Sequence, residues 1–103
     1  MQGLRSSANA MEQSPDIADL EVRRKRLIHR AHYRGFKEAD MLLGGFARDH
    51  GPELSHAEVL MFEDLLNAKD HDIYAWIIQT LPVPANYDTP LLERLRAYRP
   101  KVG

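Results

Sequence analysis

The sequence predicts an all-α fold, a compact five-helix bundle formed by a single domain. Five segments carry the spacing of apolar residues that is typical of amphipathic helices, and none alternates as a half-buried strand does. The connections between these segments are short, and the chain contains no internal repeat. A chain of 103 residues can bury one modest hydrophobic core without a disulfide or a metal ion.

The first predicted helix covers residues 16–33. Its apolar residues form one face, namely Ile17, Leu20, Leu27, Ile28 and Ala31. Arg24 falls within this face, whereas the other basic residues cover most of the remaining surface. The run RRKR at residues 23–26 suggests a nucleic-acid patch, but four consecutive helical residues point around most of the circumference. We therefore expect it to be the solvated face of an amphipathic helix.

The second predicted helix begins near Gly35 or Phe36. Its inward residues are Phe36, Ala39, Leu43, Phe46 and Ala47. Gly44 and Gly45 are a predicted weak point, because a glycine within a helix costs about 0.5–1 kcal/mol relative to alanine. The Gly-Pro pair at residues 51–52 ends the helix.

The third predicted helix has the clearest start signal. Ser55 is a favoured N-cap residue, and Glu58 completes a capping box. Leu54 and Val59 occupy the positions of a hydrophobic staple. The inward residues that follow are Val59, Phe62, Leu65 and Leu66.

The fourth predicted helix, HDIYAWIIQTL, is apolar nearly all round, and Asp70 is expected to cap it. Such a helix is either the central one of a bundle or has a second face that a partner covers. Trp76, with Tyr74 on the same helix, therefore suits either core packing or an interface.

The fifth predicted helix opens with Thr89 as N-cap and Pro90 at the first helical position, and it ends at Pro100. Its inward residues are Leu91, Leu95 and Tyr98. We expect a disordered N-terminal segment at residues 1–15, the five-helix domain at residues 16–99 and a tail at residues 100–103.

The composition excludes several classes of protein. The chain has 14 basic and 15 acidic residues, which is not the balance of a protein that coats nucleic acid or anionic lipid. It has no cysteine, so a disulfide scaffold, a thiol nucleophile and a Cys-ligated metal are excluded. No apolar run approaches the roughly 20 residues that span a bilayer, and the N-terminal residues lack the apolar centre of a secretory signal.

No residues suggest a metal site or a catalytic centre. His29 and His32 are spaced i, i+3 and could share a helix face, but nothing nearby in the sequence completes a ligand set. Serine and threonine occur in the N-terminal segment or at helix caps. Glu38 and Asp40 are two residues apart, so on a helix they point in different directions. An enzyme with its own chemistry is not expected.

The strongest candidate site is YRGFKEAD at residues 33–40. Arg34 and Glu38 are spaced i, i+4, and such an ion pair contributes only about 0.2–0.5 kcal/mol. Gly35 lowers helix stability, and one physical use for it is to let another surface approach the backbone closely. A guanidinium and a carboxylate beside it would form a charged recognition patch. The residues alone leave a helix boundary and a recognition site equally open.

The sequence Arg34-Gly35-x-x-Glu38 is similar to the RGxxE motif of the succinate dehydrogenase assembly factors, the small FAD assembly proteins of bacteria and mitochondria. The resemblance also includes the basic first helix and the sequence LLGGFA. The sequence LSHAEVLMFEDLLNAKDHDIYAWI resembles the family pattern of a Ser-capped helix, Phe-x-x-Leu-Leu and aromatic-x-Trp. Here Tyr74 and Trp76 supply the aromatic pair. The resemblance covers about residues 18–98 in the same order and spacing.

The resemblance implies a chaperone with a five-helix fold rather than an enzyme. Such proteins bind the flavoprotein subunit of succinate dehydrogenase, and in some bacteria that of fumarate reductase. They promote covalent attachment of FAD to a histidine of that subunit, and the flavoprotein supplies the chemistry. No cofactor is expected to bind tightly to this chain, which has no glycine-rich phosphate loop and no evident cavity.

The resemblance places the partner-binding site at Arg34, Gly35 and Glu38. Tyr33, Asp40 and Trp76 are added as candidates, with Asp40 expected to orient Arg34 or to pair with Arg24. Substitution of Arg34 or Glu38 by alanine is expected to weaken binding and leave the fold nearly intact.

We expect a monomer that neither inserts into a membrane nor binds nucleic acid. It would act in the bacterial cytoplasm, or in the mitochondrial matrix if the source is eukaryotic. The alternative is a small helical nucleic-acid-binding or regulatory domain that uses the basic first helix. A third hypothesis is an interaction module with an unrelated partner.

Overall fold

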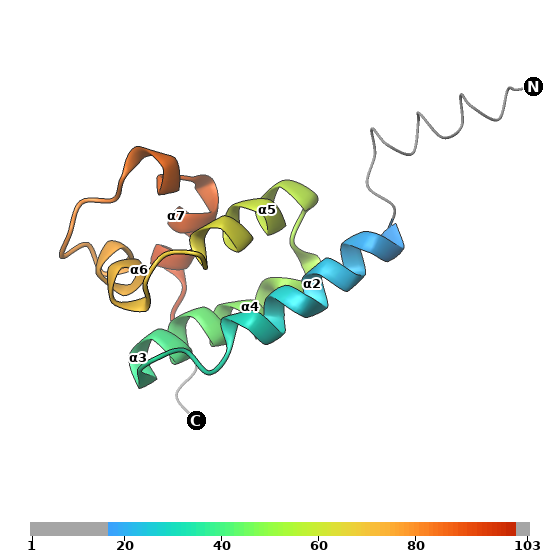
Figure 1. The fold of residues 1–103 in the computed structure, drawn as a ribbon, viewed down its shortest axis with the longest axis horizontal. Helices are drawn as coiled ribbons and strands as arrows, with labels where there is room; N and C mark the ends of the chain where they lie inside the picture. Colours follow the sequence, from blue (N-terminus) through green and yellow to red (C-terminus); the bar gives the residue numbers. More distant parts are fainter. Residues whose placement is uncertain (1–16, 101–103) are drawn as a thin grey trace, which may run out of the picture.

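A computed structural model describes residues 17–100, and within this range the chain folds into five helices and no strand (Figure 1). The first helix is α2 (Ile17–Ala31), and the last three are α5 (His56–Leu65), α6 (Asp70–Ile77) and α7 (Pro90–Ala97). The helix between α2 and α5, the second in the chain, is continuous but has three parts. The second helix consists of α3 (Lys37–Ala39), a π-helical turn (Asp40–Gly44) and α4 (Gly45–His50). Short 3₁₀ turns occupy Gly51–Glu53 and Ala85–Tyr87. The predicted five-helix bundle is confirmed, whereas residues 1–15 and 101–103 lie outside the described residues.

Two helix starts follow the predicted capping chemistry. The Glu58 N–H donates to Ser55 Oγ at 3.1 Å, and the Ser55 N–H donates to Glu58 Oε1 at 2.9 Å. Thr89 accepts the N–H of Leu92 at 3.2 Å, directly before the N-terminal proline of α7. Each bond satisfies a backbone group that the first helical turn would otherwise leave unpaired.

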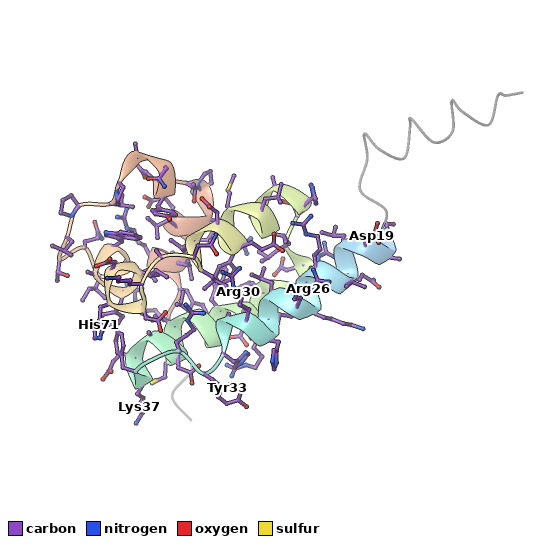
Figure 2. The ribbon with its side chains drawn as sticks, in the orientation of Figure 1. Asp19, Arg26, Arg30, Tyr33, Lys37 and His71 are labelled. Carbon is purple, nitrogen blue, oxygen red and sulfur yellow. The ribbon has the colours of Figure 1, made fainter. Side chains whose placement is uncertain are left out.

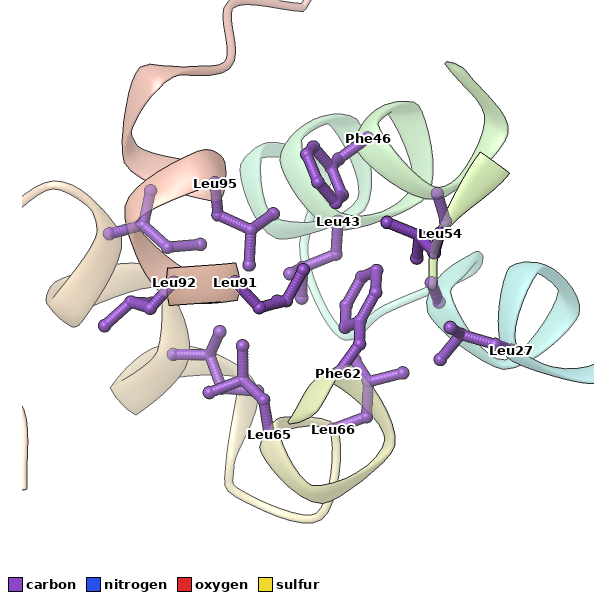
Figure 3. Close-up of a cluster of buried hydrophobic side chains, with 14 of the residues drawn as sticks. Leu27, Leu43, Phe46, Leu54, Phe62, Leu65, Leu66, Leu91, Leu92 and Leu95 are labelled. Carbon is purple, nitrogen blue, oxygen red and sulfur yellow. The ribbon is translucent and has the colours of Figure 1, made fainter. Parts of the chain in front are cut away.

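The hydrophobic core lies where the helices meet. Figure 3 shows the rings of Phe46 and Phe62 among leucines from the surrounding elements. The large side chains with less than 2% exposure are Leu27, Leu43, Phe46, Leu54, Val59, Phe62, Ile73, Leu91, Leu92 and Leu95. The predicted inward residues are therefore mostly confirmed. Ile17 is an exception at 72% exposure, because the start of α2 extends beyond the other helices (Figure 1).

The glycine pair at residues 44–45, where a weak point of the helix was predicted, also serves packing. Both glycines are buried, and a Cβ atom at Gly45 would lie only 2.8 Å from the hydroxyl of Tyr98. That hydroxyl donates to Asp49 Oδ2 at 2.7 Å. Burial, together with this bond, raises the pKa of Tyr98 to about 12, so the phenol keeps its proton above the pH at which an exposed tyrosine ionises. Gly45 thus lets the segment after α7 pack against α4.

The fourth helix is shorter than predicted and is not the central one. α6 ends at Ile77, and its buried residues Ile73, Trp76 and Ile77 form one face. The apolar residues beyond it, Ile78 and Leu81, are 46% and 50% exposed. The continuous apolar sequence therefore combines a short amphipathic helix with an exposed apolar turn. Within residues 17–100, no helix is long and apolar enough to cross a membrane.

Candidate functional site

The loop between α2 and α3 is anchored to the start of α6 by one carboxylate. The Arg34 guanidinium donates through Nε and Nη2 to Asp70 Oδ1, the Nε bond being 2.9 Å long. The backbone N–H of Gly35 donates to the other oxygen, Oδ2, at 2.7 Å. Only 15% of the Arg34 side chain and 20% of the Asp70 side chain are exposed. The predicted N-cap role of Asp70 is wrong, because Lys69 precedes α6 and the carboxylate faces the loop.

Arg34 joins three helices rather than pairing with Glu38. Its Nη1 donates to the carbonyl of Arg30 in α2 at 2.9 Å, and its Nη2 also lies 3.5 Å from the carbonyl of Leu66 after α5. The i, i+4 ion pair that the sequence offered does not form. Glu38 is exposed, and no described residue makes an ion pair or hydrogen bond with its carboxylate. The two charged residues of the motif therefore have different environments.

Gly35 permits a close approach, but the group that approaches belongs to the same chain. A Cβ atom at Gly35 would lie 3.2 Å from Asp70 Oδ2, which is tighter than ordinary van der Waals contact. Gly35 is itself exposed. An exposed glycine directly beside a partly buried ion pair leaves one face of the loop free of side-chain atoms.

Asp40 holds the residue before the motif in an uncommon conformation. Tyr33 has a φ of 59°, in the left-handed region that few residues other than glycine adopt. Asp40 Oδ1 accepts the Tyr33 N–H at 2.6 Å. The expectation that Asp40 orients Arg34 or pairs with Arg24 is wrong, because its carboxylate bonds the Tyr33 N–H and Arg24 donates instead to the carbonyl of Leu54 at 2.8 Å. The Tyr33 side chain is 86% exposed and points away from the bundle (Figure 2).

Trp76 lies in the core. It is 7% exposed, and its ring stacks on Tyr87 with 5.1 Å between centroids. Of the two interpretations that the sequence left open, the structure therefore places Trp76 in core packing. Nearer the motif, Phe36 stacks on His71 at 4.4 Å and meets the edge of Tyr74 at 5.3 Å. This aromatic cluster fixes α3 against α6.

An open groove of about 480 Å³ lies beside the motif, where the sequence predicted no cavity. α3 and the π-helical turn contribute Glu38, Met41 and Leu42. The other lining residues are Tyr74, Ile77, Ile78, Gln79, Arg96, Tyr98, Arg99 and Pro100. Sequence reasoning missed this groove because its walls come from segments far apart in the chain.

The basic first helix is not a free cationic face. Arg23 Nη2 pairs with Glu63 Oε1 at 2.6 Å, which raises the pKa of Arg23 through the hydrogen bond and the charge of Glu63. Arg30 Nη2 bonds Asn67 Oδ1, and Arg24 is engaged as described above. These bonds attach α2 to α5 and to the segments directly before and after it, and they leave fewer cations for phosphate. Within residues 17–100, no three His, Cys, Asp or Glu side chains are arranged to hold a metal ion.

The ionised carboxylate of Asp70 should make the stability of the fold depend on pH in acid. Burial opposes its ionisation, but the Gly35 N–H and the hydrogen bonds and charge of Arg34 together outweigh burial and hold its pKa below the ordinary 3.8. A carboxylate with a lowered folded pKa stabilises the fold above the unfolded pKa and loses that contribution as pH falls. We expect the urea midpoint to fall as pH drops below about 4. In Asp70→Asn this acid-dependent fall should be smaller, and an equal fall in both proteins would contradict the assignment.

The family model described as the flavinator of succinate dehydrogenase matches residues 25–99. The chain belongs to this family. FAD assembly factor SdhE of Acetobacter pasteurianus is 33% identical over 92 residues, which are 87% of this chain and 84% of that protein. Succinate dehydrogenase assembly factor 2-B, mitochondrial, of Drosophila persimilis is 36% identical over 81 residues, 77% of this chain and 52% of that protein.

A third relative, succinate dehydrogenase assembly factor 2, mitochondrial, of Cryptococcus neoformans, is 37% identical over 86 residues, 82% of this chain and 49% of that protein. The chain thus spans about half the length of these two mitochondrial relatives. The resemblance to the assembly factors is confirmed at the level of the family. The family match includes the loop, both ends of the Arg34–Asp70 contact and every residue of the groove lining except Pro100.

Proposed function

We propose that this protein is an assembly factor that binds the flavoprotein subunit of succinate dehydrogenase and promotes covalent attachment of FAD to it. The observation that carries the proposal is the family match, which extends over nearly the whole described bundle. The names of the relatives, FAD assembly factor and succinate dehydrogenase assembly factor, agree with it. We include the flavoprotein of fumarate reductase as a second client.

The proposed role is that of a monomeric chaperone, with the chemistry in the partner. Covalent attachment requires the reacting atoms to be held in near-attack geometry. A protein that binds only the competent arrangement of the flavoprotein shifts the population toward it. FAD is then a group of the partner, and this chain holds no cofactor tightly. The site of action is the bacterial cytoplasm, or the mitochondrial matrix in a eukaryote, as the names of the mitochondrial relatives suggest.

We divide the motif region into contacting and positioning residues. Tyr33 and Glu38 are exposed and are assigned the direct contacts with the flavoprotein. Gly35 leaves the loop surface open beside them. Arg34 and Asp40 are assigned a positioning role, because their hydrogen bonds fix the loop and their side chains are partly buried. Trp76 is assigned to the core of the bundle.

The test is co-expression of the flavoprotein subunit with or without this chain in a strain that lacks its own assembly factor. Flavin fluorescence of the denatured flavoprotein band reports covalent FAD, and staining reports total protein. We expect the ratio to rise when the chain is present and to fall again with Glu38→Ala. Glu21→Ala is the matched control and should behave as wild type, because Glu21 is also an exposed glutamate but lies in α2, away from the motif. Equal fluorescence with and without the chain would refute the proposed function.

A further inference from the structure

The groove beside the motif has an apolar lining that remains open to solvent. Met41, from the π-helical turn, is 39% exposed, and Ile78, directly after α6, is 46% exposed. Ile77, which is buried, and Leu42, which is partly buried, also line the groove. Exposed apolar side chains in a concave site, edged by polar groups, are typical of binding surfaces.

Two charges of opposite sign line this groove and lack an opposite charge among the described residues. Glu38 has no described ion pair or hydrogen bond. Arg99 donates only to backbone carbonyls, those of Arg96 at 2.8 Å and Tyr98 at 3.0 Å. The neighbouring Arg96 differs, because it pairs with Glu93 at 2.8 Å. Glu38 comes from α3 and Arg99 from the segment after α7, so the two charges belong to different walls.

The backbone at the end of α6 carries strain at a residue that lines the groove. Gln79 has a φ of 66°, at the position after a helix where glycine is strongly favoured. The helix ends in a Schellman-type bond, with the Thr80 N–H donating to the carbonyl of Ala75 at 2.9 Å. Glycine would satisfy this geometry at lower cost. A side chain kept at such a position points to a role for that side chain.

We propose that this groove binds an extended segment of the flavoprotein that is rich in apolar side chains. A basic residue of the segment pairs with Glu38, and a carboxylate pairs with Arg99. The Gln79 side-chain amide, which offers a donor and an acceptor, pairs with the backbone of the segment. The inference rests on the proposed function and specifies the chemistry of the partner at this surface.

A second copy of this chain fits the groove less well than a partner segment. A stable interface between two proteins buries roughly 800 Å² on each partner. The exposed apolar residues of the groove are few, and the groove is concave. Its volume of about 480 Å³ suits the side chains of a narrow segment. The groove carries both a negative charge, Glu38, and a positive charge, Arg99. These charges are complementary to a segment that carries charges of both signs, and they give no particular reason for a symmetric dimer of this chain.

The experiment compares affinity and stability for the full chain and its groove variants. Binding to the purified flavoprotein subunit is measured by calorimetry, and melting temperature by circular dichroism. Ile78→Ser should weaken binding by about tenfold, the equivalent of one lost apolar anchor. Arg99→Glu should weaken it by about fivefold and reduce its dependence on salt. Leu60→Ser, at a leucine in α5 that is 44% exposed, and Arg26→Glu, at an exposed arginine in α2, are matched controls expected to bind as wild type.

Gln79→Gly gives the sharpest result, because it separates stability from binding. Glycine relieves the strained conformation, so the melting temperature should rise by a few degrees. The affinity should nevertheless fall, since the amide is lost. A purely structural role for Gln79 would not produce this opposite pair of changes.

Three outcomes would overturn the inference. If wild type neither binds the flavoprotein nor raises its covalent FAD, the proposed function fails and the groove assignment fails with it. If wild type binds but the Ile78, Gln79 and Arg99 variants bind equally well, only the groove assignment is wrong. If sedimentation shows a wild-type dimer that Ile78→Ser dissociates, the groove is an interface between copies of this chain.

Discussion

Phe62→Ala is expected to lower the free energy of unfolding by about 3–5 kcal/mol, the usual cost of removing a buried phenylalanine. Phe62 is 0% exposed, and its ring meets the edge of Phe46 with 5.7 Å between centroids. It lies on α5, which packs against both α2 and α7. The substitution removes apolar surface and leaves a cavity that close-packed neighbours fill only in part. Because small domains are stable by only about 5–15 kcal/mol, the substitution should remove a large fraction of the free energy of unfolding.

Urea denaturation followed by circular dichroism measures this change. Leu60→Ala is the matched control on the same helix, since Leu60 is 44% exposed and its loss should cost no more than about 0.5 kcal/mol. Phe62→Leu should fall between the two, because it keeps the site apolar and restores part of the volume. A loss below about 1 kcal/mol for Phe62→Ala would contradict the central place of this ring in the core.

The sequence was sufficient where a structural feature is local. The capping box of Ser55 and Glu58 needs only a spacing of three residues, and Thr89 followed by Pro90 marks a helix start by the same logic. Helical spacing also identified Phe62 and most of the core. It failed for Ile17, because a periodic pattern shows which face is apolar but not how far the neighbouring helices extend.

The site was less predictable because tertiary contacts determine it. Arg34 has a carboxylate four residues away at Glu38, yet it bonds Asp70, which lies 36 residues away. The local pair is weak for an exposed helix, whereas Asp70 offers both oxygens in a partly buried position. Gly45 and Tyr98 are likewise far apart in the sequence and close together in the fold. Sequence spacing therefore identified the motif residues, and only the fold shows which of them are already paired.

Arg34→Ala is expected to lower the free energy of unfolding by about 2–3 kcal/mol, because it leaves a partly buried carboxylate without its cation. This differs from the sequence-based expectation that the substitution would leave the fold nearly intact. Arg34→Lys should recover less than half of the loss, since an ammonium group cannot reproduce the planar fork that reaches Asp70 and the helix-end carbonyls. Arg48→Ala is the matched control, because Arg48 pairs with Asp49 at the surface and is 60% exposed.

A double-mutant cycle separates the Arg34–Asp70 interaction from the other effects of each substitution. Arg34→Ala combined with Asp70→Ala should be less destabilising than the sum of the single variants, because no unpaired charge remains. Additive losses would show that the two side chains are not coupled.

Binding to the flavoprotein then distinguishes the two charged residues of the motif, Arg34 and Glu38. Glu38→Ala should weaken binding at unchanged stability, whereas Arg34→Ala should weaken binding only together with the stability of the loop that presents Tyr33 and leads into α3, which carries Glu38.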